Sequence, residues 1–226
     1  MNDILAVINQ CEKQMEAALW SLEAPGEMEK ALAAYQQVEA RLESLEIGDI
    51  HPAYPEQQRV LSYCLMRQGN LLRQMGQPQA ALALSQREIA AARACGDTIA
   101  LARSLMSNGT NFIVTGQQEK GLGLLEESRS LFASQDAYDY QQGLGWYWIL
   151  QADLVNAGLV NKPPLEVVRA AGSALSILKP IENWAGVARA LAARAQAFDR
   201  LGNAQAAEDD RLEQKRFEGM VEKRQD

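Results

Sequence analysis

A pattern of side-chain sizes recurs four times along the 226-residue chain and strongly constrains its fold. Each copy centres on a small residue, with a large residue four positions before it, a polar residue one position before it and a large residue three positions after it. The small residues are Gly69, Gly109, Ala152 and Ala195, spaced 40, 43 and 43 residues apart. Positions separated by three or four residues share one face of an α-helix, and Gly69 in that face is expected to let a second helix approach closely. Recurrence at this period predicts stacked helical units rather than one globular core.

Turn signals follow the first helix of most copies. Gly76, Gly116 and Gly202 each stand seven residues after their small residue. Gly76 suits the left-handed backbone just past a helix end, and Pro78 suits the first turn of the next helix. The alanine-rich stretch that ends at Ala94 supplies that second helix. The repeated unit is therefore predicted to be a helical hairpin.

These residues resemble the tetratricopeptide repeats (TPR), in a longer variant of about 40 residues. The resemblance rests on the large, small, large pattern, on the run Gly76–Leu82 (GQPQAAL) and on the run Ile89–Asp97 (IAAARACGD). It covers the chain from about Ser62 to Phe217. The resemblance implies an all-α, right-handed α-α superhelix of helical hairpins, which serves as a protein-binding scaffold.

We expect one TPR-like solenoid over residues 1–226, without a separate domain boundary. Asp97 and Asn183 precede two of the first helices and are predicted N-caps, because their side chains accept hydrogen bonds from free backbone N–H groups. The final helix is predicted to cap the solenoid with one solvated face. The expected units are a degenerate N-terminal hairpin, 1–50, and four repeats, 55–97, 97–136, 138–180 and 183–221. The first helix of the N-terminal hairpin is expected to run from Asn2 to Leu22.

Net charge and cysteine content make several classes of function unfavourable. The net charge is −7 and the pI is about 4.9, which disfavours binding to nucleic acid or to an anionic membrane surface. Three cysteines and the single His51 have no metal-ligand spacing, so no metal and no cofactor are expected. The N-terminus lacks a signal-peptide pattern, and no apolar run reaches the length of a membrane span. These features predict a cytoplasmic protein with reduced thiols.

Catalytic chemistry is not expected from this sequence. A nucleophile would need a supporting base, and His51 stands alone in a proline-flanked loop. The acidic pairs Glu126-Glu127 and Asp209-Asp210 are adjacent on helices and therefore point in different directions. No phosphate-binding loop or dinucleotide fingerprint is present, and glycines such as Gly121 and Gly123 lie inside a helical pattern, where they are expected to permit close packing. We therefore predict a protein that is not an enzyme.

The resemblance implies that the first helices line a concave groove that receives a partner. Its arginines suit carboxylates, and its aromatic and methionine side chains suit interface anchors, so we predict binding of an acidic or C-terminal segment of another protein. The candidate groove residues are Tyr63, Met66, Arg67, Asn70, Arg73, Arg103, Met106, Thr110, Trp146, Asp153, Arg189 and Gln196.

Other interpretations stay open. Longer repeats often hold a peptide backbone with an asparagine two positions before the small residue. Those positions here are Arg67, Ser107, Leu150 and Ala193, so either the partner binds differently or the groove is not the site. One alternative function is a regulatory sensor for a small peptide or metabolite, which that ligand would stabilise against heat. A second is a self-associating structural protein, a homo-oligomer whose larger mass light scattering would detect.

Overall fold

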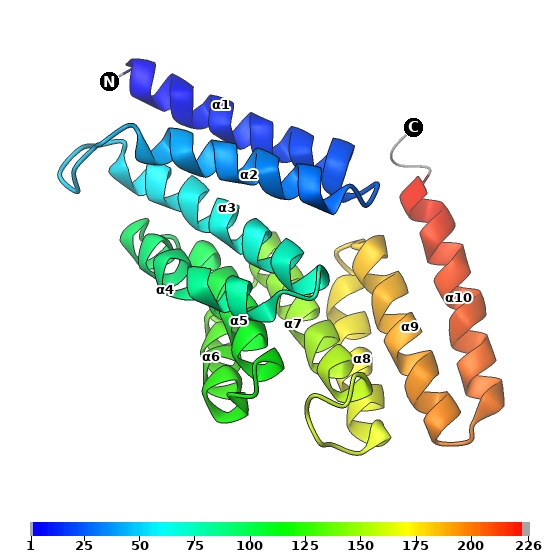
Figure 1. Ribbon diagram of the computed structural model, residues 1–226. Helices are drawn as coiled ribbons and strands as arrows, with labels where there is room; N and C mark the ends of the chain where they lie inside the picture. Colours follow the sequence, from blue (N-terminus) through cyan, green and yellow to red (C-terminus); the bar gives the residue numbers. More distant parts are fainter. Residues whose placement is uncertain (1, 223–226) are drawn as a thin grey trace. The chain divides into compact units, whose positions relative to one another are not determined.

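The computed structural model describes residues 2–222, and its regular elements in that range are all helices (Figure 1). The all-α architecture of successive hairpins is therefore confirmed. The predicted limits of the individual repeats stay a prediction. The elements are α1 (Asn2–Ala18), η1 (Leu19–Glu23, a π-helix), α2 (Met28–Glu43), α3 (Tyr54–Gln74), α4 (Pro78–Ala94), α5 (Thr98–Val114), α6 (Gln118–Phe132), α7 (Tyr138–Asn156), α8 (Pro164–Leu178), α9 (Trp184–Arg200) and α10 (Ala204–Glu222).

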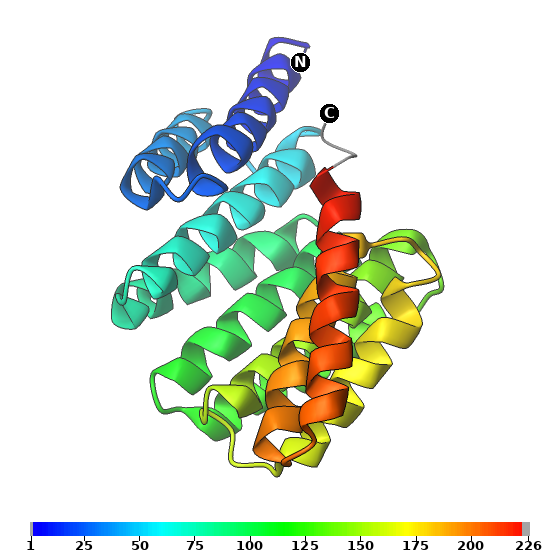
Figure 2. The same cartoon turned by 90° about the vertical axis from the view of Figure 1, so that its right-hand side faces the viewer.

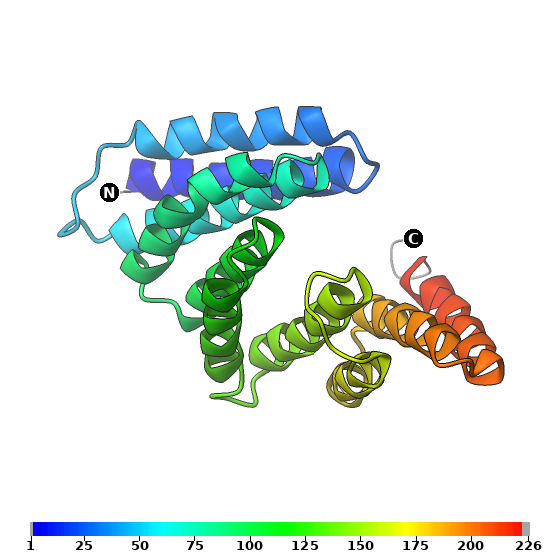
Figure 3. The same cartoon turned by 60° about the horizontal axis from the view of Figure 1, so that its bottom comes forward.

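The helices form two compact units, described separately below, of which the first ends at Ser128 and the second begins at Arg129, within α6. In the first unit α3 packs against α1, α2, α4 and α5, and α1 and α2 run side by side as a hairpin (Figure 3). Its core contains Tyr35 and Leu42 of α2 and Leu65 and Leu71 of α3, all fully buried. Because α3 contacts four other helices and contributes fully buried side chains to the core, it is the central helix of the unit.

In the second unit α9 packs against α7, α8 and α10, and α9 and α10 lie side by side along their lengths (Figure 2). The rings of Trp184 and Phe217 stack with centroids 5.3 Å apart, which joins the start of α9 to the end of α10. Gly143 and Gly145 of α7 leave room for Phe132 and Leu178, because a Cβ at either glycine would overlap those side chains. Bare backbone at these two positions therefore allows α7 to pack closely.

Local signals in the sequence set the helix ends as predicted. The Asp97 carboxylate accepts hydrogen bonds from the backbone N–H groups of Ile99 and Ala100, at 2.7 and 3.1 Å. Asn183 Oδ1 accepts one from the N–H of Gly186 at 2.9 Å. Gly76, at the end of α3, has φ of +75°, the left-handed conformation expected there. These N-cap and turn predictions are confirmed.

The large residues of the repeating pattern are mostly buried. Leu65, Leu105 and Leu191 have no exposed surface. Trp148 holds the same position in α7 but is only half-buried, packed on the edge of the second unit's core. The indole is large and rarely becomes fully enclosed, which explains the departure from the expected core position.

The small residues at the centre of the repeating pattern differ in how much space surrounds them. A Cβ added to Gly109 of α5 would lie 2.8 Å from the Leu125 side chain and 2.9 Å from the carbonyl oxygen of Gly121 in α6. Close helix approach, which we expected at Gly69, therefore occurs at Gly109 instead. A Cβ at Gly69 would meet only Asn111 Nδ2, at an ordinary 3.7 Å, because the neighbouring helix stands farther away there. Close packing was also expected at Gly123, and this is wrong, because the space around it is open.

The first helix differs from the uninterrupted helix expected to Leu22. It ends at Ala18, and Leu19–Glu23 continue as a π-helical turn. Turns of this kind are uncommon and often lie near functional positions. No helix within residues 2–222 is both long and apolar enough to span a membrane.

Candidate functional site

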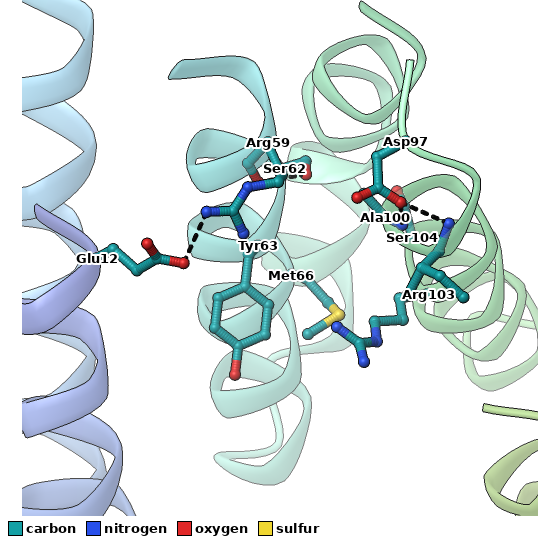
Figure 4. Close-up of a pocket in the computed structure, with 10 residues that line it drawn as sticks. Glu12, Arg59, Ser62, Tyr63, Met66, Asp97, Ala100, Arg103 and Ser104 are labelled. Atoms are coloured by element: carbon teal, nitrogen blue, oxygen red, sulfur yellow. Dashed lines mark hydrogen bonds and ion pairs between the residues drawn. The ribbon is translucent and has the colours of Figure 1, made fainter. Parts of the chain in front are cut away.

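A pocket of about 170 Å³ lies in the first unit, where α1, α3 and the start of α5 meet (Figure 4). It brings together three predicted groove residues, Tyr63 and Met66 of α3 and Arg103 of α5. The spacing of three residues places Tyr63 and Met66 on one face of α3. The remaining lining residues are Glu12, Arg59, Ser62, Asp97, Ile99, Ala100 and Ser104.

One arginine of the pocket is already neutralised. Arg59 donates to both carboxylate oxygens of Glu56, at 2.7 and 2.9 Å, and to Glu12 Oε1 at 2.7 Å. Hydrogen bonds to Arg59 hold the pKa of the Glu56 carboxyl below its ordinary value. The pair with Glu12 also ties α3 to α1. Arg59 and Glu12 are not among the predicted groove residues, because their contact joins positions 47 residues apart in the sequence.

Arg103 is the pocket's second arginine, and it has no hydrogen-bond or ion-pair partner among residues 2–222. Its side chain reaches toward Met66, with the Tyr63 ring nearby on the same side (Figure 4). Asp97 also lines the pocket and uses a carboxylate oxygen to cap α5. The pocket therefore combines a guanidinium that forms no ion pair within residues 2–222 with an aromatic ring, a thioether and the Asp97 carboxylate.

Arg67, a predicted groove residue, forms an ion pair with Glu23 at the end of the π-helical turn. Its Nε donates to Glu23 Oε2 at 3.1 Å, and the Tyr35 hydroxyl donates to the same oxygen at 2.8 Å. Burial opposes the charged form of Arg67, but Glu23 outweighs it and leaves the pKa of Arg67 above its ordinary value. Burial and Glu23 together raise the pKa of Tyr35. The three side chains join the N-terminal hairpin to α3.

Arg73 and Asn70, also predicted groove residues, lie beside α5. Arg73 donates to Asn111 Oδ1 at 2.7 Å and to Asn70 Oδ1 at 3.0 Å. Met106 is half-buried, whereas Thr110 is buried and its hydroxyl donates to the Met106 carbonyl oxygen at 2.9 Å. Thr110 therefore lies inside the unit rather than on an open face.

In the second unit the structure brings Asp153, Arg189 and Gln196 together around a pocket of about 310 Å³ between α7 and α9. Arg189 donates to Asp153 Oδ2 at 3.0 and 3.2 Å, although its side chain stays 58% exposed. Gln196 is exposed. Trp146 is half-buried against the core of this unit and does not line this pocket.

Sequence reasoning missed a buried acid, Glu88 of α4, which has no exposed surface. Its neighbours are Ser104, Asn108 and Ser107 of α5 and Arg73 of α3. A signal was present, because Glu88 shares one helical face with the buried Ala81, Ser85 and Ala92.

Residues 2–222 contain no group of three or more histidine, cysteine, aspartate or glutamate side chains placed to hold a metal ion. Burial raises the pKa of the Cys64 thiol to about 12, which leaves it protonated at neutral pH. Burial also raises the pKa of the Cys11 and Cys95 thiols.

Comparisons with known proteins identify the fold. No protein-family model matches the sequence, and no curated protein matches it. Among solved structures, BtubC (BKLC) from P. vanneervenii matches with a TM-score of 0.61 at 14% identity, over 97% of this chain and 92% of that chain. A putative kinesin light chain from Podosopora anserina with nearly identical TPR-like repeats matches with a TM-score of 0.53 at 15% identity, over 95% and 97%. The chain therefore has the TPR-like fold, an all-α array of helical hairpin repeats.

Proposed function

We propose that this protein is a non-enzymatic interaction module that binds a segment of a partner protein through the first-helix face of its repeats. TPR-like repeats generally act as protein-interaction scaffolds and are typically not catalytic. The partner segment carries a carboxylate, from an acidic side chain or its own C-terminus, that enters the pocket beside Arg103.

The observation that supports this proposal is that the Arg103 guanidinium forms no hydrogen bond or ion pair within residues 2–222. It lines the pocket without a partner in the described part of the chain, whereas Arg59 is neutralised by Glu56 and Glu12. A guanidinium offers a carboxylate two parallel hydrogen bonds, and such charge-assisted bonds are roughly twice as strong as neutral ones. Tyr63 and Met66 beside it provide the apolar contact that anchor residues require.

The size of this pocket favours one residue of a peptide over a complete metabolite. Small-molecule sites usually occupy about 300–1,000 Å³, whereas this pocket encloses about 170 Å³. A single side chain that projects from an extended segment suits the smaller volume. For this pocket, the volume favours a side chain of a partner segment over a small-molecule ligand.

The test is affinity capture from a lysate of the source cells with three folded baits: the wild type, Arg103→Glu and Arg93→Glu. Arg93 is an exposed arginine of α4 that does not line the pocket, so its variant matches the charge change elsewhere. Circular dichroism and thermal melting first establish that all three baits fold. Mass spectrometry then identifies the captured proteins.

We expect a protein that the wild type and Arg93→Glu capture and that Arg103→Glu does not. A synthetic peptide from its most acidic or C-terminal segment should then bind the wild type directly and lose at least tenfold in affinity with Arg103→Glu, about 1.4 kcal/mol. Identical capture by all three baits, or none by any, would reject the pocket as the binding site.

A further inference from the structure

A buried polar cluster in the first unit lies at the junction of α3, α4 and α5. Glu88 of α4 is its acid, and its side chain is fully enclosed. Facing it are Ser104, Asn108 and Ser107 from α5 and Arg73 from α3, of which Arg73 alone is charged. A buried carboxyl group normally has hydrogen-bond donors around it or a paired cation.

Hydrogen bonding in this cluster leaves acceptors without donors. Asn108 Nδ2 donates to the Ser104 carbonyl oxygen at 2.9 Å. That oxygen can only accept, so it fixes which end of the Asn108 amide is nitrogen. Within residues 2–222, Asn108 Oδ1 and both carboxyl oxygens of Glu88 have no hydrogen-bond partner, and neither do the buried Ser85 Oγ and Asn111 Nδ2. A proton on one Glu88 oxygen converts that oxygen into a donor for Asn108 Oδ1, which reduces the acceptors without a donor from three to one.

Arg73 is placed to respond to the charge on Glu88. Its hydrogen bonds go to the neutral side-chain oxygens of Asn111 and Asn70, and it forms no ion pair within the described chain. Burial lowers the pKa of Arg73, and the nearby Glu88 counteracts part of that effect. Burial raises the pKa of Glu88 to about 8, from an ordinary 4.5. The acceptors without donors and the raised pKa both indicate that Glu88 is neutral at pH 7.

We propose that Glu88 is a buried proton switch: protonated, it donates to Asn108 Oδ1 and holds α4 to α5, and ionised, it pairs with Arg73. Ionisation breaks the carboxyl O–H bond and releases the proton to solvent. The Arg73 guanidinium then turns from Asn70 and Asn111 toward the new carboxylate, because an ion pair in a low-dielectric interior is stronger than a hydrogen bond to an amide.

The switch has a consequence for binding that rests on the proposed function. Asn70 and Arg73 belong to the predicted groove, so a change in their hydrogen bonding alters the surface offered to a partner. Protonation of Glu88 leaves the positive charge of Arg73 available to an anionic segment. Ionisation withdraws that charge, so an acidic partner would bind more weakly above pH 8 than at pH 7.

The test uses nuclear magnetic resonance on the whole chain and needs no partner. The Glu88 side-chain carboxyl ¹³C shift, the Arg73 Nε–H shift and the Asn70 and Asn111 side-chain amide shifts are followed from pH 4 to pH 10. Glu88→Gln is the informative variant, because its amide donates to Asn108 Oδ1 at every pH and cannot ionise. Glu119→Gln removes an exposed acid of α6 as the matched control.

We expect Glu88 to titrate with a midpoint near pH 8, and the Arg73 and Asn111 signals to move with the same midpoint in the wild type and in Glu119→Gln. These movements should disappear in Glu88→Gln. A Glu88 midpoint near 4.5, or Arg73 signals that ignore the titration, would overturn the switch. The wild-type titration decides this even if Glu88→Gln misfolds, and it is independent of the capture experiment that tests the proposed function.

Discussion

Gly121 of α6 approaches the backbone of Gly109 in α5 so closely that a Cβ on Gly121 would lie 2.5 Å from the Gly109 carbonyl oxygen. Backbone atoms cannot change rotamer to relieve such a contact, so the two helices would have to separate. Gly123, two residues later, is exposed, and a Cβ there would meet nothing within 4 Å. The two glycines of one helix therefore have opposite tolerance for alanine.

We predict that Gly121→Ala lowers the free energy of unfolding by about 1–3 kcal/mol through overpacking. Gly123→Ala should raise it by about 0.5–1 kcal/mol, because alanine is the better helix former in open space. Urea unfolding monitored by circular dichroism measures both. Equal stability of the two variants would contradict the close approach of α5 and α6.

Asp97 should stabilise the start of α5 mainly as a hydrogen-bond acceptor. Asp97→Ala removes the acceptor for the N–H groups of Ile99 and Ala100 and should cost about 1 kcal/mol. Asp97→Asn keeps an acceptor oxygen and should stay within a few tenths of a kcal/mol of the wild type. Thermal unfolding of both variants tests this, and an equal loss in both would indicate that the charge, rather than the cap, stabilises the helix.

Asp210 of α10 should be more important to stability than its neighbour Asp209. Arg194 of α9 donates to both Asp210 oxygens, at 2.7 and 2.8 Å, and only 7% of the Asp210 side chain is exposed. Asp210→Asn leaves the partly buried Arg194 without its counter-ion and should cost about 2 kcal/mol. Asp209 is exposed and accepts from Gln205, so Asp209→Asn should change stability by less than about 0.5 kcal/mol. Chemical unfolding of the pair measures the difference.

Glu88→Gln should change how stability depends on pH. Because the pKa of Glu88 is raised to about 8 in the folded chain, its contribution to stability is fully present below pH 4.5 and is lost as the pH rises to 8. Glu88→Gln removes this loss, so at pH 7 it should be more stable than the wild type by up to about 3 kcal/mol. The two proteins should converge near pH 4.

Urea unfolding at pH 4, 5.5, 7 and 8.5 compares Glu88→Gln with the wild type and with Glu119→Gln. Since Glu119 is exposed, its variant should follow the wild type at each pH. A constant difference between Glu88→Gln and the wild type across this range would show that Glu88 ionises normally in the folded chain.

Local chemistry explains what the sequence could predict. The Asp97 cap and the turn at Gly76 depend on residues within a few positions, and the pattern that buries Leu65, Leu105 and Leu191 repeats within single helices. Each of these features could be predicted without knowing which helix is the neighbour. The all-helical hairpin fold follows from such local signals because the backbone hydrogen bonds of a helix and its apolar face are both determined by one continuous segment.

Contacts between residues of different helices could not be predicted from local sequence in the same way. The sequence does not reveal that Glu23 pairs with Arg67, 44 residues away, or that Glu88 faces Asn108 across a helix interface. The close approach was assigned to Gly69, although Gly109 is the position that needs it, because the spacing between neighbouring helices depends on side chains from both. Of the candidate groove residues, Tyr63, Met66 and Arg103 share one pocket, whereas Thr110 is buried.

The ion pair between Glu23 and Arg67 means that, at this position of the predicted groove, a carboxylate of the chain itself already holds the arginine. A carboxylate from outside would have to displace Glu23, and Tyr35 would lose its acceptor in the exchange. The free energy gained when the incoming carboxylate binds Arg67 would roughly equal the free energy lost when Glu23 of the N-terminal hairpin releases it. Net affinity for an acidic segment must therefore come from arginines that have no internal competitor, and Arg103 meets that condition in the first unit.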